Sequence, residues 1–199
     1  INKKISLYNN IDFQEKFLFR IQPELIDVYL ERNRNTTYFY LNFFQFKLKR
    51  IFDILFSLIL IILSSIVILL SAFLIFVEDG LPVFFKQYRT GKDMILFNVF
   101  KLRTMKNNSE KDGPRWSKAN DNRITYLGKF LRLARIDELP QLFLVLQGKM
   151  SLIGPRPERP EFDRKIILEI PNFNYRYKVL PGISGWAQVN YPYGASIKD

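Results

Sequence analysis

The longest apolar pattern in the chain runs from Ile54 to Val77 and contains no charged side chain. As an α-helix rising about 1.5 Å per residue, this run reaches roughly 36 Å, which is enough to cross the hydrocarbon core of a bilayer. A buried helix of a soluble domain is the alternative, but charge-free runs of this length are rare in small soluble domains. The pattern therefore predicts a membrane-embedded helix within residues 47–80.

Basic residues flank the apolar run at both ends: Lys47, Lys49 and Arg50 precede it, and Lys86, Arg89 and Lys92 follow it. A spanning helix normally has its Lys/Arg excess on one side only. Basic residues at both ends fit a re-entrant helix that enters and leaves on the same face, although a straight span remains open. Ser64 and Ser65 lie near the middle, where hydroxyls can bond back to the preceding turn and bend a helix.

Four residues of this segment are assigned to the membrane and its headgroups: Lys49, Arg50, Ser64 and Ser65. Asp53 follows the two cations by about one helical turn. We therefore expect an interfacial ion pair that reduces the cost of placing the Asp53 carboxylate near lipid.

After the apolar run the pattern changes. Val83–Tyr88 and Met94–Phe100 are rich in β-forming residues and are separated by a turn-forming segment, which predicts a small β-hairpin. Ile124–Ala134 combines apolar and basic residues at helical spacing, which predicts an amphipathic surface helix able to lie on an anionic membrane. A solvated helix face is the commoner meaning of that pattern. Residues 1–46 are polar and mixed, and are interpreted as an N-terminal linker or accessory segment. The fold class predicted is α-rich α+β.

Composition limits the chemistry. Histidine and cysteine are both absent, which excludes Ser-His-Asp triads, zincin helices, disulfides and cysteine nucleophiles. Acid–base or nucleophilic work falls to carboxylates, Lys, Tyr, Ser or Thr. The net charge of +11 indicates an anionic partner: nucleic acid, a phosphate-bearing substrate or anionic lipid. Nucleic acid is disfavoured, because the usual basic–aromatic motifs are missing and the apolar run would be unexplained.

Two adjacent carboxylates, Asp137 and Glu138, follow Arg132 closely in the sequence. Asp137 is predicted to cap the helix that follows, and Pro140 fits the first turn of that helix. Carboxylates at the positive end of a helix dipole, with arginines just upstream, attract phosphate and a divalent metal ion. On local pattern alone, an ordinary Asp cap with an acidic first turn is the simpler interpretation.

Three other segments offer groups for binding phosphate, base or sugar. Arg156 stands between two prolines, and a guanidinium on so stiff a loop suits bidentate phosphate binding. Lys101 and Arg103 place two cations at the end of the second predicted strand. Gln188 and Asn190 supply amides beside a tryptophan. Each segment also has a plain structural interpretation: a connector, a solvated strand end, and a core aromatic residue.

Taken in order, these segments resemble the bacterial sugar transferase family, the monotopic phosphoglycosyl transferases. The matching blocks are Lys49–Asp53, Gln87–Gly91, Lys101–Met105, Leu127–Arg132, Asp137–Leu142, Gly148–Ser151, Gly154–Pro157 and Pro181–Asn190. Four positions depart from the family pattern: Ser65 replaces the proline of a Ser-Pro bend, Leu102 a phenylalanine, Leu144 an asparagine and Lys149 an acidic residue.

The resemblance implies an activity and a location. Members move a hexose 1-phosphate from a UDP-sugar to undecaprenyl phosphate and release UMP, at the cytoplasmic face of the bacterial inner membrane. This is the first membrane step of capsule, exopolysaccharide or O-antigen assembly. By resemblance, residues 81–199 form the catalytic domain on the cytosolic face. A catalytically inactive membrane scaffold of a glycan assembly complex is the alternative.

The resemblance also implies residue roles. Asp137 becomes the nucleophile, and Glu138 assists metal placement and proton handling, with both holding Mg²⁺ as the cofactor. Arg132 and Arg156 bind phosphate. The sequence leaves open which sugar is transferred, whether the protein forms homo-oligomers, and whether it contacts downstream glycosyltransferases.

Overall fold

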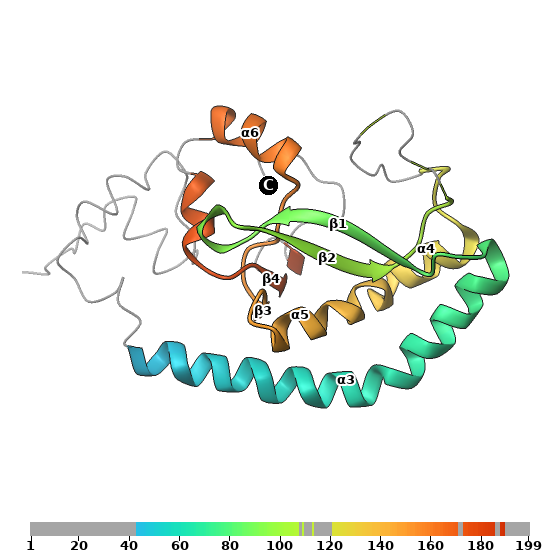
Figure 1. The fold of residues 1–199 in the computed structure, drawn as a ribbon, viewed down its shortest axis with the longest axis horizontal. Coiled ribbons are helices and arrows are strands. Elements are labelled where there is room, and N and C mark those ends of the chain that lie inside the picture. The colour runs from blue at the N-terminus through green and yellow to red at the C-terminus, as the bar shows by residue number, and fades with distance from the viewer. Residues whose placement is uncertain are drawn as a thin grey trace, which may run out of the picture.

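A computed structural model describes residues 43–107, 109, 113, 121–170, 173–185, 188 and 189. Most of the predicted linker at 1–46 lies outside these residues. In chain order the described elements are helix α3 (Phe43–Asp79), strand β1 (Phe84–Thr90), the 3₁₀ helix η4 (Lys92–Met94), β2 (Leu96–Leu102), α4 (Tyr126–Leu133), η5 (Ile136–Gln141), α5 (Leu142–Leu146), β3 (Ser151–Ile153), α6 (Pro160–Glu169), η6 (Phe173–Lys178) and β4 (Gly182–Ser184). The α-rich α+β class is confirmed for this part of the chain (Figure 1).

Helix α3 is a single helix of 37 residues that curves beneath the rest of the described chain (Figure 1). The hydroxyl of Ser64 donates to the Leu60 carbonyl at 2.6 Å, and that of Ser65 donates to the Ile62 carbonyl at 2.8 Å. The predicted back-bonding of these serines is thus confirmed. The helix stays continuous through them, because each hydroxyl adds a bond to the preceding turn without replacing a backbone bond.

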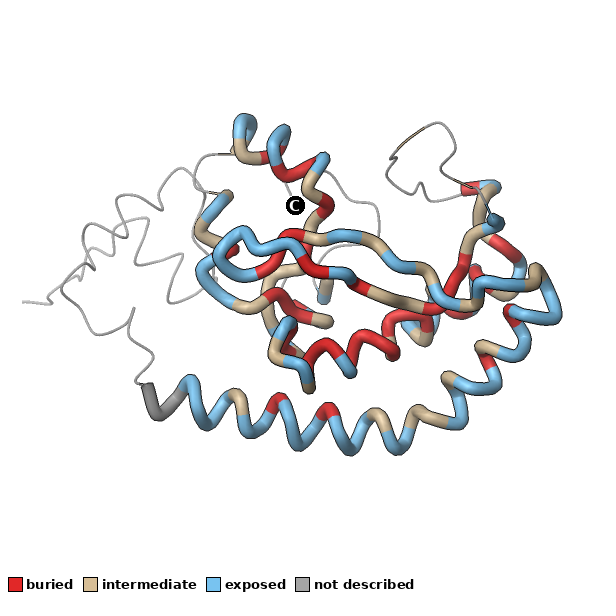
Figure 2. Tube along the Cα trace, viewed as in Figure 1, coloured by how far each residue is buried: buried red, intermediate tan, exposed pale blue. Residues whose placement is uncertain are grey.

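The inward-facing positions of α3 recur every three or four residues. They are Asp53, Ser57, Ile61, Ser64, Ile68, Ser71 and Ile75. Four of these seven are polar, whereas the opposite face consists of exposed Ile, Leu, Phe and Val side chains. Only 11% of the most apolar window of the helix is buried, and Figure 2 shows the exposed colour along most of its length. A surface helix of a soluble protein has the reverse arrangement, so the outer face of α3 is suited to lipid.

The start of α3 is fastened to the remainder of the described chain, which we call the body (residues 80–189). The Lys49 ammonium lies 3.0 Å from the Asp53 carboxylate, which confirms the predicted ion pair. Asp53 also accepts hydrogen bonds from the Ser151 hydroxyl at 2.9 Å and from the Leu152 amide at 3.2 Å. The Asp53 carboxylate therefore binds β3 as well as its own helix.

Arg50 caps helix α5. Its guanidinium donates to the carbonyls of Val145 at 2.6 Å and Leu146 at 3.0 Å, which lie in the last turn of that helix. Carbonyls at a helix C-terminus lack intrahelical partners, and a cation there also complements the helix dipole. Arg50 is predicted to lie at the lipid headgroups, and in the structure its guanidinium binds these two carbonyls.

The far end of α3 is fastened to the body too. Arg103, directly after β2, donates to the carbonyls of Asp79 at 2.9 Å and Gly80 at 2.7 Å and pairs with the Asp79 carboxylate at 3.2 Å. The Leu127 amide of α4 donates to the Glu78 carboxylate at 3.1 Å. Both ends of the apolar helix therefore contact one body.

Strands β1 and β2 form the predicted hairpin, paired antiparallel from Phe84↔Leu102 to Thr90↔Leu96. Both strands end two residues later than the sequence pattern indicates. The turn has the expected length but lies two residues later, at residues 91–95, where Asp93 and Met94 adopt left-handed conformations with φ of 54° and 62°. Pairing therefore continues up to the turn.

The core lies between the hairpin and the helices. One cluster of buried apolar side chains comprises Phe97, Val99, Leu144, Val145 and Met150, and a second comprises Ile75, Leu102 and Leu131. The second cluster joins α3, β2 and α4 in one packed group. It therefore fixes the hairpin and α4 against the end of the membrane-facing helix.

Strands β3 and β4 pair in parallel, through Ser151↔Gly182 and Ile153↔Ser184. The backbones of Gly154, directly after β3, and Gly182, at the start of β4, approach closely. A Cβ on either residue would overlap the backbone of the other. Glycine is required at both positions because of this approach. The pairing brings the loop that carries Arg156 beside the segment that follows β4.

Candidate active site

The two adjacent carboxylates lie on η5, directly after α4. Thr125 caps α4 by accepting a hydrogen bond from the Gly128 amide at 3.0 Å. Arg135 then adopts a left-handed conformation with φ of 57° and precedes η5. The prediction that Asp137 caps a helix is wrong, because Arg135 takes the cap position and Asp137 falls inside the first turn of η5. Asp137 and Glu138 are only 4% and 5% exposed.

Arg156 binds Glu138. One guanidinium nitrogen lies 2.9 Å from Glu138 Oε1, and a second lies 3.5 Å from Oε2. Arg135 adds a longer ion pair at 3.8 Å. A two-point contact of this kind fixes the plane of both groups. Among the described residues, no hydrogen bond to the Asp137 carboxylate is found, whereas Glu138 is bound by Arg156.

Lys101 of β2 and Arg132 of α4 complete the charged group around Asp137. Burial lowers the pKa of Lys101 to about 8, with the negative charge of Asp137 opposing the shift and Arg132 and Arg156 adding to it. Arg132 is held in place by donating from Nε to the Thr104 hydroxyl at 2.8 Å. The structure thus gathers five of the predicted site residues, from three elements (β2, α4 and η5) and one loop.

The two carboxylates have pKa values shifted in opposite directions. Burial raises the pKa of Asp137 above its ordinary value, with Lys101 opposing the shift and Glu138 adding to it. Burial also acts to raise the pKa of Glu138, but the charge and hydrogen bond of Arg156 outweigh it, and the pKa is lowered. Adjacent acids whose environments separate their pKa values are typical of sites where the two take different roles.

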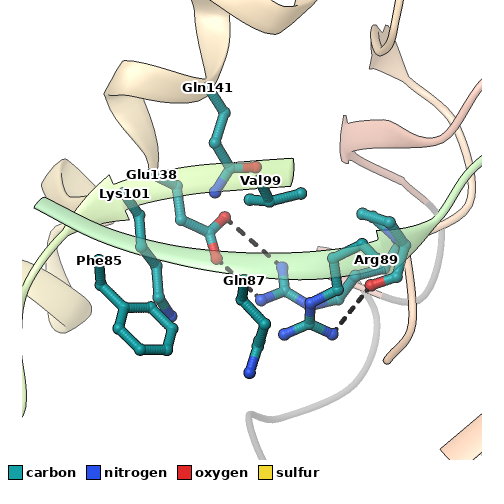
Figure 3. Close-up of a pocket in the computed structure, with 9 residues that line it drawn as sticks. Phe85, Gln87, Arg89, Val99, Lys101, Glu138 and Gln141 are labelled. Carbon is teal, nitrogen blue, oxygen red and sulfur yellow. Dashed lines mark hydrogen bonds and ion pairs between the residues drawn. The ribbon is translucent and has the colours of Figure 1, made fainter. Parts of the chain in front are cut away.

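A pocket opens beside this group (Figure 3). The residues lining it are Phe85, Gln87, Arg89, Val99, Lys101, Glu138, Gln141, Arg156 and Pro157. Figure 3 shows Gln87 between Phe85 and Arg89 along β1, with Glu138 and Gln141 coming from the helical side. Because alternate residues of a strand share a face, Phe85, Gln87 and Arg89 form one wall. Arg89, Lys101 and Arg156 make the pocket rich in cations, which favours a phosphate-bearing ligand.

The sequence analysis did not name several residues whose side chains line the pocket, among them Gln87, Arg89 and Gln141. The signal was present for the strand residues: a hairpin with period-two alternation puts residues 85, 87 and 89 on one face. Gln141 carried no such signal, since only the packing of η5 against β2 places it at the pocket.

Other predicted site residues lie elsewhere. The Arg103 guanidinium is 6% exposed and bound to the end of α3, so the geometry gives no support for a substrate contact there. Gln188 follows β4 and donates weakly to the Ile183 carbonyl at 3.5 Å. Asn190 lies outside the described residues. Lys49, predicted beside headgroups, is turned toward Asp53 and Ser151.

Residues 44–198 match the model of a family described as bacterial sugar transferase. The chain belongs to the bacterial sugar transferase family. It is 49% identical over 152 residues to a UDP-N-acetylgalactosamine-undecaprenyl-phosphate N-acetylgalactosaminephosphotransferase of Aeromonas hydrophila. The alignment covers 76% of this chain and 36% of that protein.

Two further relatives carry related names. A putative undecaprenyl-phosphate N-acetylgalactosaminyl 1-phosphate transferase of Bacillus subtilis is 47% identical, with 65% of this chain and 72% of that protein aligned. A UDP-glucose:undecaprenyl-phosphate glucose-1-phosphate transferase of Caulobacter vibrioides is 42% identical, with 71% and 53% aligned. The chain thus spans little more than a third of the Aeromonas protein and about half of the Caulobacter protein.

Among the described residues, no cluster of three or more Asp or Glu side chains is found. The adjacent pair Asp137–Glu138 is nevertheless a suitable donor set for Mg²⁺, which is typically bound by one or two carboxylates together with substrate phosphates and water. Arg156 contacts both carboxylate oxygens of Glu138, and Glu138 also lines the pocket.

Proposed function

We propose that this bacterial sugar transferase moves a hexose or N-acetylhexosamine 1-phosphate from a UDP-sugar to undecaprenyl phosphate, releasing UMP and starting the assembly of a polysaccharide. One observation carries the proposal: a buried carboxylate pair lies among Lys101, Arg132 and Arg156 beside a cation-lined pocket. The names of the relatives, all undecaprenyl-phosphate sugar-phosphate transferases, support the same donor and acceptor classes.

In the first step, a carboxylate oxygen of Asp137 attacks the donor phosphorus nearest the sugar. A bond forms between that oxygen and phosphorus, the phosphorus–oxygen bond to UMP breaks, and its electron pair leaves with UMP. An aspartyl-phosphosugar remains on the protein, as expected for carboxylate nucleophiles. Lys101 and Arg132 favour the ionised form of Asp137 and stabilise the negative charge that develops on the phosphoryl oxygens.

In the second step, an oxygen of the lipid phosphate attacks the same phosphorus and the Asp137 carboxylate leaves. The product is a lipid-linked diphosphosugar, and Asp137 is restored. Arg156 orients the Glu138 carboxylate beside the reacting group and lies within reach of phosphoryl oxygens in the pocket. Mg²⁺ held by Asp137 and Glu138 would supply further neutralisation of phosphate charge.

The arrangement of α3 supports a one-sided, re-entrant association with the cytoplasmic face of the membrane. A straight span would separate the ends of the helix by about 30 Å of hydrocarbon. Here Asp53 near one end and Asp79 at the other both bind the same polar body. The body would have to enter the hydrocarbon to contact both ends of a straight span, which its charged residues oppose.

Because the chain contains no cysteine, topology is testable with single-cysteine variants. Lys47→Cys and Lys86→Cys place one thiol on each side of the apolar run. In intact spheroplasts, a membrane-impermeant thiol reagent should label neither variant, whereas both should react after lysis. Labelling of either variant in intact spheroplasts would contradict the one-sided arrangement.

The activity is tested by mixing the detergent-solubilised protein with undecaprenyl phosphate and a panel of UDP-sugars and measuring released UMP. We expect UMP release that depends on Mg²⁺ and is specific for one or a few sugars. Omitting the lipid should leave a sugar-labelled protein when the donor carries a labelled sugar. If no UDP-sugar yields UMP, the inactive-scaffold alternative is favoured instead.

A further inference from the structure

The loop that carries Arg156 is held along its whole backbone. Four consecutive carbonyls, those of Pro155, Arg156, Pro157 and Glu158, each accept a hydrogen bond, and the donors come from three elements: β4, η6 and β1. The donors are the Gly182 amide at 2.9 Å, the Arg176 guanidinium, the Arg89 guanidinium at 3.1 Å and the Thr90 amide at 2.9 Å. The two prolines restrict the chain further, so the position of the Arg156 guanidinium is set by these four donors.

Two of these donors, the Thr90 amide and the Arg176 guanidinium, are connected to one buried carboxylate, that of Asp163. The Thr90 hydroxyl at the end of β1 and the Tyr177 hydroxyl of η6 both donate to Asp163, one to each carboxylate oxygen. Thr90 carries the amide that binds the Glu158 carbonyl, and Tyr177 adjoins Arg176. Asp163 is 2% exposed and lies in the first turn of α6, where the helix dipole favours a negative charge.

Asp163 therefore joins three elements that together support one loop: β1, α6 and η6. Hydrogen bonds to an ionised group are stronger than bonds between neutral groups, and a buried carboxylate left without partners is costly. The Arg176 guanidinium also packs 4.3 Å from the centre of the Phe173 ring, which orients the donor to the Arg156 carbonyl. Removing the Thr90 or the Tyr177 hydroxyl that binds Asp163 should therefore make the backbone of the Arg156 loop more mobile.

We propose that Asp163, bound by Thr90 and Tyr177, is a positioning residue that holds the Arg156 loop in its phosphate-binding place. This inference rests on the proposed function, because the phosphate in question belongs to the UDP-sugar. Asp163 is not among the residues that line the pocket. Its effect reaches the donor only through the backbone of residues 155–158 and the Arg156 guanidinium.

The test compares variants that remove one hydroxyl with variants that keep it. Thr90→Val and Tyr177→Phe keep the shape of the side chain but lose the hydrogen bond to Asp163, while Thr90→Ser retains the hydroxyl. Ile166→Val serves as the matched control: Ile166 is a buried residue of the same helix, α6, and makes no side-chain hydrogen bond to the loop. Two readouts are measured, hydrogen exchange of the amides in residues 154–159 and the kinetics of UMP release.

We expect faster amide exchange in the loop and a roughly three- to tenfold higher KM for the UDP-sugar in Thr90→Val and Tyr177→Phe, with kcat within about twofold of wild type. Thr90→Ser should behave as wild type in both readouts. Ile166→Val should lower the Tm without changing either. A change in loop exchange and KM in the two hydroxyl-deleting variants, together with a change in Tm alone in Ile166→Val, distinguishes the positioning of Arg156 from a general loss of stability.

Unchanged loop exchange in both hydroxyl-deleting variants would overturn the positioning role. Faster exchange with an unchanged KM would overturn its link to donor binding while leaving the proposed function intact. If the wild-type protein releases no UMP with any donor, the proposed function fails and the donor link fails with it. The exchange data would still decide whether Asp163 holds the loop. If Thr90→Val does not fold, Tyr177→Phe alone decides.

Discussion

Helix α3 and the body place polar and apolar side chains in opposite ways. In the body, Leu102, Val145 and Met150 are completely buried and most charged groups lie at the surface or in the pocket. In α3, Asp53 and Ser57 are buried while long apolar side chains cover the outside. The difference indicates two solvents, since each region exposes the type of surface that its surroundings accept: water for the body and hydrocarbon for the helix.

The comparison also explains the placement of the carboxylate pair. η5 contacts both β2 of the hairpin and α3, so Asp137 lies in the layer between the aqueous pocket and the lipid-facing helix. A reaction between a water-soluble donor and a lipid phosphate requires a group within reach of both phases.

Replacing Asp137 with Asn should lower transfer by at least about a thousandfold, because an amide cannot act as the nucleophile. Membrane association should be unchanged, since α3 is untouched. UMP release and sedimentation with membranes measure the two properties. Asp93→Asn, at the exposed hairpin turn, is the matched control and should retain activity. Near-wild-type turnover by Asp137→Asn would remove Asp137 from the mechanism.

Leu63→Arg tests the outer face of α3, where Leu63 is 71% exposed. A charge at the bilayer centre costs roughly 2.5–3.5 kcal/mol on insertion scales, so partitioning into membranes should fall by roughly a hundredfold. Leu168→Arg, on the equally exposed surface of α6, should leave partitioning unchanged because that surface faces water. Flotation with liposomes provides the measurement. Equal behaviour of the two variants would refute the two-solvent comparison.

Lys101 should make donor binding sensitive to alkaline pH. Its pKa is lowered to about 8, so the ammonium is charged below that value and loses its proton above it. We expect the KM for the UDP-sugar to rise several-fold between about pH 7 and pH 9. Lys101→Arg keeps its charge throughout this range and should remove the alkaline rise. A profile that is the same for both proteins would assign the pH dependence to another group.

The smallest effect is expected at the junction of the two regions. Arg50→Gln should lose at least one of the two hydrogen bonds to the end of α5 and destabilise the fold by roughly 1–3 kcal/mol. Thermal unfolding in detergent measures the loss. Lys129→Gln, on an exposed position of α4, is the control and should change the Tm little. A Tm equal to that of wild type would show that α5 does not need this cap.

Local pattern was sufficient for elements whose partners are near in sequence. The apolar helix, the serine back-bonds, the Lys49–Asp53 pair and the hairpin are all confirmed, because each depends on residues within a few positions of one another. Boundaries were less certain: the hairpin strands end two residues later than predicted, and the left-handed Arg135 displaced Asp137 from the cap position. Left-handed conformations at non-glycine residues have no strong sequence signal.

By itself, the sequence determined that this protein has one long lipid-compatible helix, a cationic surface and no imidazole or thiol chemistry, and its motif order indicated the family. Only the tertiary structure decided which charged side chains meet. It brought Lys101, Arg132 and Arg156 to Asp137 and Glu138, and it directed Arg50 and Arg103 to carbonyls of α5 and α3 instead. Periodicity reports which face of an element is buried, but the partner of a buried cation depends on how distant segments pack.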